Sequence, residues 1–168
     1  GHVGSLDPLA TGMLPICLGE ATKVAGEILE GAKHYRFTIA LGAATATGDL
    51  EGEVVRRADI PALDPVRVAT VLQTFLGAGT QVPPMYSAIK RDGVPLYRLA
   101  RQGIEVEREE RSVRIDHLTL AAIGAGRLHV TVACSKGTYI RVLAEDIGVA
   151  LGTVAHLLEL RRTGFGDF

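Results

Sequence analysis

The stretch Lys33–Gly42, which reads KHYRFTIALG, decides the class of fold that this chain can adopt. From Tyr35 to Leu41 every second residue is aromatic or aliphatic, and the residues between them are Arg, Thr and Ala. This period of two predicts a β-strand with one buried face, and the glycine at position 42 ends the strand. Such a strand needs neighbours in a sheet and a second layer over its apolar face.

Further strands are predicted on both sides of this stretch. Two long segments near the C-terminus are separated by the turn Gly124-Ala125-Gly126, which predicts a hairpin. The segment Ala43–Gly52, AATATGDLEG, is rich in turn residues and is expected to be a loop. The expected strands are Met13–Leu18, Glu53–Arg56, Val113–Ala122, Leu128–Ala133 and Ala155–Arg161.

Three segments carry apolar residues at the spacing of a helix. They mix with the strands without a regular βαβ alternation, so the sequence favours an α+β fold, with a mixed, mostly antiparallel sheet and flanking helices. The predicted helices are Ala21–Leu29 closed by Gly31, Pro65–Phe75 with Asp64 as N-cap, and Ile140–Leu151 with Thr138 as N-cap and Gly152 behind it.

The composition is that of one globular domain. The chain has 168 residues, of which 47% are hydrophobic and 22% are charged. No apolar run reaches the roughly 18 residues that cross a bilayer, and the N-terminus lacks the build of a signal peptide, so we expect a cytoplasmic protein without membrane contact. Because Gly1 lies inside what reads as a functional loop, we also expect an upstream segment.

The spacing of cysteines and histidines predicts neither a metal site nor a disulfide framework. Cys17 and Cys134 are far apart and have no CxxC partner, so both are expected to be buried free thiols. The five histidines show no HxxxH pattern, and SKGT at Ser135–Thr138 lacks the upstream glycines of a P-loop. We therefore expect no metal, and no motif indicates a nucleotide cofactor.

Aromatic and basic residues are interleaved in a way that is typical of RNA-binding proteins. The net charge is only −1, but each of the four tyrosines lies within four residues of a Lys or Arg. In single-stranded RNA readers, bases stack on such rings while cations hold phosphates. Ordinary surfaces have the same pattern when Tyr and Arg extend their polar ends into water. The tyrosines are Tyr35, Tyr86, Tyr97 and Tyr139.

The segment Pro83–Arg111 interrupts the regular pattern. It contains PPMYSAIKRDG, a short helical piece and the charged run EVEREER. We interpret it as an excursion from the core, and the alternative is a solvated charged loop. Its candidate phosphate-binding residues are Lys90, Arg91, Arg98 and Arg101.

One acidic residue near the N-terminus has an unusual setting. In GHVGSLDPLATG, Gly1–Gly12, Asp7 is followed by a proline that restricts its backbone, and glycines on either side permit tight turns or close approach. A carboxylate on such a stiff loop can act as a nucleophile if a cation keeps it ionised. The alternative is an Asx turn, in which the carboxylate only bonds backbone N–H groups.

Arg141 is the candidate cation for Asp7. It lies in the first turn of the predicted third helix. A local pair with Glu145, four residues on, competes with this assignment and would contribute only about 0.3–0.5 kcal/mol. The spacing alone favours the local pair with Glu145.

Five motifs follow one another along the chain. They are GHVGSLDPLATGMLPICLGEATK (1–23), KHYRF (33–37), TATGDLEGEVV (45–55), PPMYSAIKRDGVPLYRLARQGIEVEREER (83–111) and CSKGTYIRVLAEDIG (134–148). In this order, and over nearly the whole length, the chain resembles the TruB family of pseudouridine synthases.

The resemblance implies a pseudouridine synthase catalytic core over residues 1–168. It implies that the protein converts uridine to pseudouridine at position 55 in the T loop of tRNA, as bacterial members do. The family needs no cofactor, because the reaction is an isomerisation. The implied partner is the tRNA T stem-loop, bound by a monomer without a protein partner. An upstream segment with a Lys-Pro motif and a small C-terminal RNA-binding domain, both usual in the family, are not visible here.

The resemblance also assigns roles to individual residues. Asp7 matches the family's nucleophilic aspartate, Arg141 matches the arginine that pairs with it, and Asp49 matches a second acid in that network. The excursion resembles an insertion that grips RNA, in which its basic residues would contact phosphates.

The target base is expected to leave the RNA stack and to meet a set of matching residues. Tyr35 matches the tyrosine that packs on the base, and Leu160 matches an apolar residue that lines the uracil pocket. His2 matches the histidine that enters the RNA where the base has left. Tyr139, next to Arg141, is expected among the substrate-binding residues.

Three other functions were weighed against this one. A guide-RNA-dependent relative is less favoured, because LATGML after Asp7-Pro8 and the long excursion look bacterial. An RNA-binding or tRNA-folding module with secondary catalysis would not need Asp7, Tyr35 and Arg141 together. An Asp-dependent glycoside hydrolase would need two carboxylates about 5 to 9.5 Å apart, and only Asp49 offers a second acid.

Overall fold

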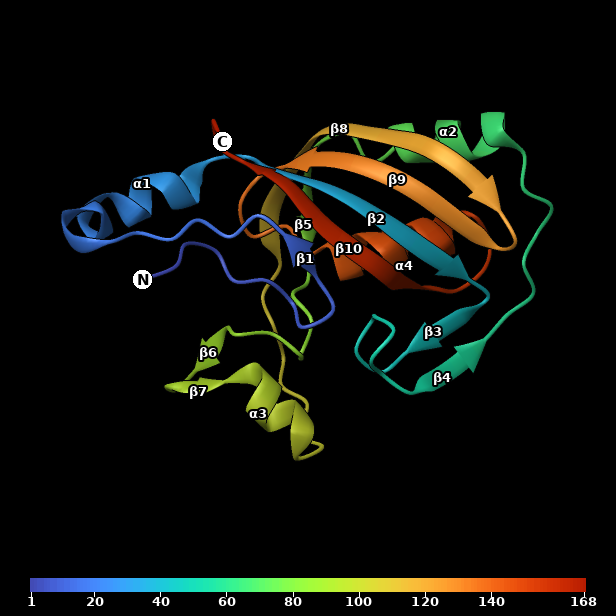
Figure 1. Ribbon diagram of the computed structural model, residues 1–168. Coiled ribbons are helices and arrows are strands. Elements are labelled where there is room, and N and C mark those ends of the chain that lie inside the picture. Colours follow the sequence, from blue (N-terminus) through green and yellow to red (C-terminus); the bar gives the residue numbers. More distant parts are fainter.

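The computed structural model describes all residues from 1 to 168 and shows one main sheet of six strands. The strand order is β1-β10-β2-β9-β8-β5, and every pair is antiparallel except β1 and β10. The predicted α+β class with a mostly antiparallel sheet is therefore confirmed (Figure 1). The strands are β1 (Thr11–Gly12), β2 (Lys33–Leu41), β5 (Gly77–Gln81), β8 (Arg111–Gly124), β9 (Arg127–Cys134) and β10 (Ala155–Phe165).

The stretch KHYRFTIAL forms β2, which lies inside the sheet between β10 and β9. Phe37 is opposite Leu160 on β10 and Val130 on β9, so three apolar side chains meet in one row of the core. Phe37, Ile39 and Leu41 are all buried. The alternation predicted from the sequence is thus confirmed.

Two helices, α2 (Pro65–Gln73) and α4 (Ile140–Ala150), pack on the buried face of the sheet. Figure 1 shows α4 behind β2 and β10 and α2 beside β8. Asp64 caps α2 as predicted, because its carboxylate accepts a hydrogen bond of 3.0 Å from the amide of Val66. The helices reach the core with Val68, Leu72, Leu143, Ala144 and Ile147.

The predicted N-cap of α4 is wrong by one residue. Tyr139, not Thr138, is the N-cap, and its side chain makes no capping hydrogen bond. The hydroxyl of Thr138 instead lies 3.3 Å from the hydroxyl of Ser135, in the turn that follows β9. The start of α4 is instead held by a side chain of β5, that of Gln81.

The predicted strand Met13–Leu18 is also wrong. Only Thr11–Gly12 pairs with β10, and beyond it Ile16 makes a single bridge with His2. Pro15 has no N–H to donate, so a regular ladder cannot continue through this segment.

The predicted amphipathic helix Ala21–Leu29 consists of two shorter pieces. A 3-10 helix, η1 (Gly19–Val24), is followed by α1 (Ala25–Glu30), and neither buries a residue. Figure 1 shows α1 extending away from the sheet. Of its apolar residues, Ala25 and Ile28 pack, partly buried, on the small cluster of Val3, Cys17 and Phe165 and not on the main core.

Like the short strand β1, the strands β3 (Ala43–Thr45) and β5 were not predicted. β3 lies in the expected loop and pairs with β4 (Val54–Arg57), close to the expected strand Glu53–Arg56. β5 reads GAGTQ, which has no alternation of large apolar residues, yet its backbone pairs along β8 from Gly77 opposite Ile115. Backbone pairing alone leaves little trace in side-chain periodicity.

The long hairpin of β8 and β9 is as predicted, with Ala125 and Gly126 at positive φ in its turn. In the excursion 83–111 the predicted short helical piece is α3 (Leu96–Arg101). It follows a small hairpin, β6 (Lys90–Arg91) and β7 (Val94–Pro95), that was not predicted. In Figure 1 these elements lie below the main sheet. Their pairing with one another is separate from that of the six-stranded sheet.

Both cysteines are buried and free, as predicted. Burial raises the pKa of the Cys134 thiol to about 11. None of the helices combines the length and the apolar character that spanning a membrane requires.

The close packing of α4 on β10 gives a test of the fold at Gly148. A Cβ at this position would lie 2.5 Å from the Cβ of Ala155 and 3.0 Å from its amide nitrogen. Gly148→Ala should therefore lower the free energy of unfolding by about 1–3 kcal/mol through overpacking, although Ala favours an isolated helix by about 1 kcal/mol. Urea denaturation of both proteins measures the difference.

Gly26 in α1 is the matched control, since a Cβ there meets nothing within 4 Å. Gly26→Ala should leave the stability unchanged or raise it by up to about 1 kcal/mol. Equal effects of the two substitutions would contradict the packing of α4 on β10.

Candidate active site

The centre of the site is an ion pair between Arg141 and Asp7. The Nε of Arg141 donates to Oδ2 of Asp7 at 2.7 Å and its Nη2 donates to Oδ1 at 3.2 Å. This forked geometry fixes the direction of the carboxylate as well as its charge. The Arg141 side chain is only 4% exposed, whereas that of Asp7 is 33% exposed. Arg141 thus holds the Asp7 carboxylate from inside the protein, while part of the Asp7 side chain is exposed to solvent.

Arg141 also binds two backbone carbonyls from other parts of the chain. Its Nη1 donates to the carbonyl of Thr47 at 3.1 Å, and its Nη2 donates to the carbonyl of Tyr86 at 2.8 Å. The guanidinium therefore joins α4, the loop after β3, the first part of the excursion and the Asp7 loop. The competing ion pair between Arg141 and Glu145 does not form.

Asp49 supports this arrangement indirectly, through the loop that contains Thr47. It is buried, and its Oδ1 accepts hydrogen bonds from the hydroxyl of Thr47 at 2.6 Å and from the amide of Glu51 at 3.0 Å. It makes no ion pair with Arg141. Its carboxylate instead orders the loop whose Thr47 carbonyl reaches Arg141, which is an Asx-turn role.

A cavity of about 290 Å³ opens beside the ion pair. This is at the lower end of the range of small-molecule sites, roughly 300–1,000 Å³. The cavity is lined by residues from five separate segments, so the sheet, the start of α4, the Asp7 loop and the excursion together create it. Its lining includes Asp7, Tyr35, Ser87, Tyr139, Arg141, Leu160 and Arg162.

Two tyrosines contribute rings to this cavity. Tyr35 comes from β2, and Tyr139 precedes α4. Burial raises the pKa of Tyr35, and the neighbouring Arg162 opposes that rise. Burial also raises the pKa of Tyr139, with Arg111 acting in the opposite direction. Both hydroxyls are therefore protonated at neutral pH and can donate a hydrogen bond.

The first turn of α4 is held by a residue that the sequence did not single out. Gln81, buried at the end of β5, accepts from the amide of Tyr139 at 2.9 Å and donates to its carbonyl at 3.3 Å. The side-chain amide thus acts as a cap for the helix that carries Arg141. A glutamine in GAGTQ has no sequence signal that marks it for this role.

The remaining predicted residues lie outside the cavity. His2 is exposed and pairs through its backbone with Ile16. The four basic residues of the excursion are also exposed. Among them, Arg91 donates to the carbonyl of Glu107 at 2.9 Å, and Arg101 lies 5.3 Å from the centre of the Tyr97 ring.

A larger cavity, of about 670 Å³, lies between the excursion and α4. Four acids line it, Glu105, Glu110, Glu145 and Asp146, and burial raises the pKa of the Glu145 and Asp146 carboxyl groups. Neither Asp7 nor Tyr35 lines this cavity, so it lacks the central residues of the candidate site. The structure brings no three His, Cys, Asp or Glu side chains close enough to hold a metal ion.

Comparison with protein families gives matches over the whole chain. The model described as "TruB family pseudouridylate synthase (N terminal domain)" matches residues 1–140. The model described as "tRNA pseudouridylate synthase B C-terminal domain" matches residues 141–168. The boundary between them falls at the first residue of α4, the helix that packs on β10.

Several bacterial proteins are similar over the full chain. The tRNA pseudouridine synthase B of Psychrobacter cryohalolentis is 55% identical to it, and the chain covers 47% of that protein. The protein of the same name from Nitrosococcus oceani is 56% identical, with 54% of its length covered. For Bordetella avium the identity is 52% and the coverage 70%. The chain thus spans about half the length of the first two relatives.

Solved structures show the same fold. A Cbf5-Nop10-Gar1 complex contains a chain with a TM-score of 0.72 and 29% identity, and the match covers all of this chain and 41% of that one. An H/ACA RNP bound to a substrate RNA containing 2′-deoxyuridine gives a TM-score of 0.69 and 26% identity, with 39% of that chain covered.

Gln81 gives a test of how α4 is held. Gln81→Met keeps the length of the side chain but leaves the amide of Tyr139 without a partner, while the carbonyl of Tyr139 keeps its bond from the amide of Leu143. The substitution should therefore lower the free energy of unfolding by about 1–3 kcal/mol. Gln73→Met, at the exposed last residue of α2, is the matched control and should have little effect. Thermal unfolding measures both, and equal shifts in Tm would show that the Gln81 contacts contribute nothing.

Proposed function

The chain belongs to the TruB family of pseudouridylate synthases, and from this premise we propose that the protein converts uridine to pseudouridine in tRNA, at position 55 of the T loop. The observation that carries the proposal is the Asp7 carboxylate, held by the forked Arg141 guanidinium at the wall of a cavity that also contains an aromatic ring. The identity of 52–56% to proteins named tRNA pseudouridine synthase B favours tRNA as the substrate.

The cavity suits a single base that has left the RNA stack. Extruding a base costs a few kcal/mol, which stacking and hydrogen bonding in the pocket must offset. Tyr35 offers a ring face and a protonated hydroxyl, and Leu160 offers an apolar wall. We assign the exposed His2, five residues before Asp7, to the gap that the base leaves in the RNA.

The isomerisation conserves all atoms of the nucleotide. The N1–C1′ bond breaks and a C5–C1′ bond forms, while the hydrogen on C5 leaves and N1 gains a proton. Asp7 can react as a nucleophile at C6 of the ring or at C1′ of the sugar, and both routes require an ionised carboxylate. Arg141 supplies the opposite charge that keeps Asp7 ionised when the substrate displaces water.

The proposed enzyme acts as a monomer and needs no protein partner. The proposed substrate, tRNA, implies a cytoplasmic location. Because the reaction needs neither a redox change nor an activated donor, the proposal includes no cofactor.

The first test is incubation of the full-length protein with unmodified tRNA, followed by nucleoside mass mapping. Asp7→Asn should abolish formation of pseudouridine and leave tRNA binding within about three-fold, because Asn keeps the shape but loses the nucleophilic charge. Asp59→Asn, at an exposed position after β4, is the control and should retain activity.

Two outcomes of this assay would change the assignment. Turnover by Asp7→Asn at the wild-type rate would exclude Asp7 as the nucleophile. Binding of tRNA without any pseudouridine in the wild type would favour an RNA-binding or tRNA-folding module instead.

We assign the grip on tRNA to the excursion. Lys90 and Arg91 lie on its hairpin, and Arg98 and Arg101 lie on α3, all exposed to solvent. None of the four lines the cavity beside Asp7. These positions suit contacts with phosphates rather than with the reacting base.

Neutralising Lys90, Arg91, Arg98 and Arg101 together should weaken tRNA binding and flatten its dependence on salt. The slope of log K against log salt should fall by roughly 0.7 for each lost contact with a single strand, and by about 0.9 for a duplex stem. The rate on saturating tRNA should change less than the affinity. Binding titrations at several salt concentrations measure this effect.

A control variant neutralises four exposed basic residues elsewhere: Lys23, Arg57, Arg114 and Arg127. It changes the net charge by the same amount but removes nothing from the excursion. If both variants lose the same salt dependence, the effect is one of net charge, and the excursion does not grip the RNA.

A further inference from the structure

Two cations are buried next to the Asp7 cavity without a carboxylate partner. Arg162 is 2% exposed and Lys33 is 5% exposed, and neither takes part in an ion pair. A buried charge without an opposite charge is costly unless its hydrogen bonds are satisfied. The hydrogen bonds of Arg162 must therefore offset the cost of burying its charge.

The Arg162 guanidinium binds the Asp7 loop on both sides of Asp7. Its Nη2 donates to the carbonyl of Gly4 at 2.8 Å, and its Nη1 donates to the carbonyl of Ser5 at 3.4 Å. Its Nε donates to the carbonyl of Met13 at 2.8 Å. The amide of Met13 in turn donates to the carbonyl of Arg162 at 2.9 Å, so the far end of the loop is tied to β10 twice.

Two glycines of the loop allow this close approach. A Cβ at Gly12 would lie 2.1 Å from the carbonyl oxygen of Arg162, and a Cβ at Gly4 would lie 2.7 Å from the ring of Phe165. Both glycines also have positive φ. The loop on either side of Asp7 is thus shaped to fit against β10.

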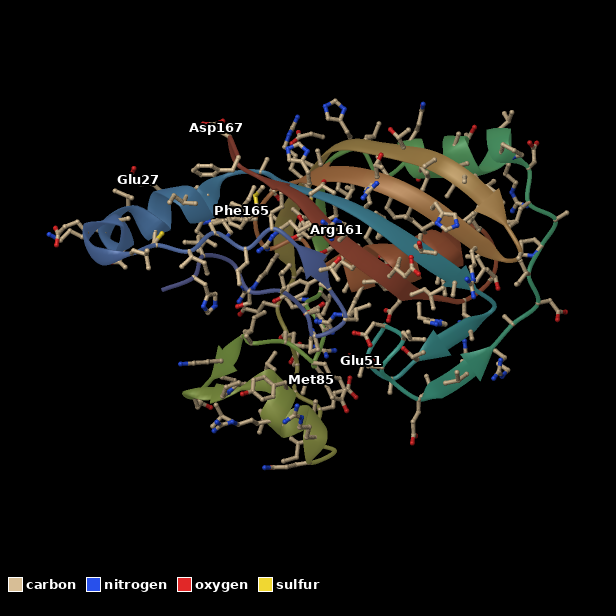
Figure 2. The ribbon with its side chains drawn as sticks, in the orientation of Figure 1. Glu27, Glu51, Met85, Arg161, Phe165 and Asp167 are labelled. Atoms are coloured by element: carbon tan, nitrogen blue, oxygen red, sulfur yellow. The ribbon has the colours of Figure 1, made fainter.

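An aromatic ring supports the guanidinium from the other side. The Arg162 guanidinium carbon lies 4.8 Å from the centre of the Phe165 ring, and the Lys33 ammonium lies 4.4 Å from it. Figure 2 shows Phe165 close to the C-terminal end of β10. Arg162 is also opposite Tyr35 in the pairing of β10 with β2. One side chain therefore contacts the nucleophile loop and neighbours the residue assigned to the base.

We propose that Arg162 is a positioning residue for the reaction: it fixes the backbone on both sides of Asp7, so that the carboxylate meets the base at the productive distance. This inference rests on the proposed function. Arg141 sets the direction of the carboxylate, but it binds no backbone atom of the Asp7 loop. The position of the loop depends on Arg162, and an error of 1 Å in such a position can lower a rate by about 100-fold.

The test is single-turnover kinetics of the full-length protein on saturating tRNA. Arg162→Lys keeps the charge but cannot reproduce a planar fork to three carbonyls. We expect its rate to fall by about 100-fold, with tRNA affinity unchanged within about three-fold. Arg162→Met, which leaves all three carbonyls unpaired, should lose more. Arg161→Lys is the matched control: Arg161 is the exposed neighbour on the same strand and should tolerate the change (Figure 2).

A second control separates positioning from stability. Leu128→Ala removes a fully buried side chain on β9 opposite Ile39, four residues along β2 from Tyr35. It should lower Tm but leave the single-turnover rate within about three-fold wherever the protein is folded. Phe165→Leu removes only the ring beneath the guanidinium and should lower the rate by a smaller factor than Arg162→Lys, so the inference can be tested even if the Arg162 variants do not fold.

Retention of the wild-type rate by folded Arg162→Lys and Phe165→Leu would overturn the proposal, as would an equal loss in Leu128→Ala at equal Tm. If the wild type itself forms no pseudouridine, the proposed function fails, and amide hydrogen exchange then decides the matter for Arg162. Faster exchange confined to Gly4–Met13 in Arg162→Lys or Phe165→Leu, and absent in Leu128→Ala, supports positioning of the loop. Exchange that rises equally over the whole sheet overturns it.

Discussion

The buried guanidinium of Arg141 is the constraint on which the site depends. A charge that is 4% exposed must be satisfied on every side, and Arg141 achieves this with a carboxylate and two carbonyls from three separate segments. All three segments must therefore be folded before the contacts of Arg141 are complete. The pairing of β1 with β10 puts β10 beside the Asp7 loop, which precedes β1, α4 packs on β10, and Gln81 on β5 holds the start of α4. Breaking a buried pair by removing one partner costs about 3–5 kcal/mol, so the geometry of the site and the stability of this corner of the fold are linked.

Two arginines divide the work of holding one aspartate. Arg141 binds the side chain of Asp7, and Arg162 binds the main chain on both sides of it. This division explains the composition of the loop. The glycines at positions 4 and 12 face Phe165 and Arg162 across distances that admit no Cβ, while a single acid is enough because its counter-charge comes from another element. Neither guanidinium could perform both tasks, because a planar fork presents its donors in one plane.

The sequence predicts the fold where side chains alternate and misses it where the backbone alone decides. Strand β2 and the hairpin of β8 and β9 each bury one face, so apolar residues recur in their sequences with a clear period of two. β5 is held by backbone pairing and has no such period. At the site, the proline and glycines around Asp7 left an Asx turn as an alternative, and spacing favoured Glu145 as the partner of Arg141. Only the resemblance indicated a nucleophilic Asp7 that pairs with Arg141. Arg162 and Gln81 left no signal, since an arginine in LELRR or a glutamine in a glycine-rich strand looks the same whether exposed or buried.

The same constraint links the excursion to the chemistry. Nη2 of Arg141 is shared between Asp7 and the carbonyl of Tyr86, which lies at the start of the excursion, next to the Met85 labelled in Figure 2. The excursion otherwise faces α4 across a cavity of about 670 Å³, so its packing there is loose. A shift of the excursion that lengthens the bond to Tyr86 leaves Nη2 with the carboxylate as its remaining acceptor. The ion pair then tightens or turns, because a buried donor does not stay unpaired at low cost. One nitrogen of Arg141 thus connects the start of the excursion to the Asp7 carboxylate, although no side chain of the excursion pairs with Asp7 itself.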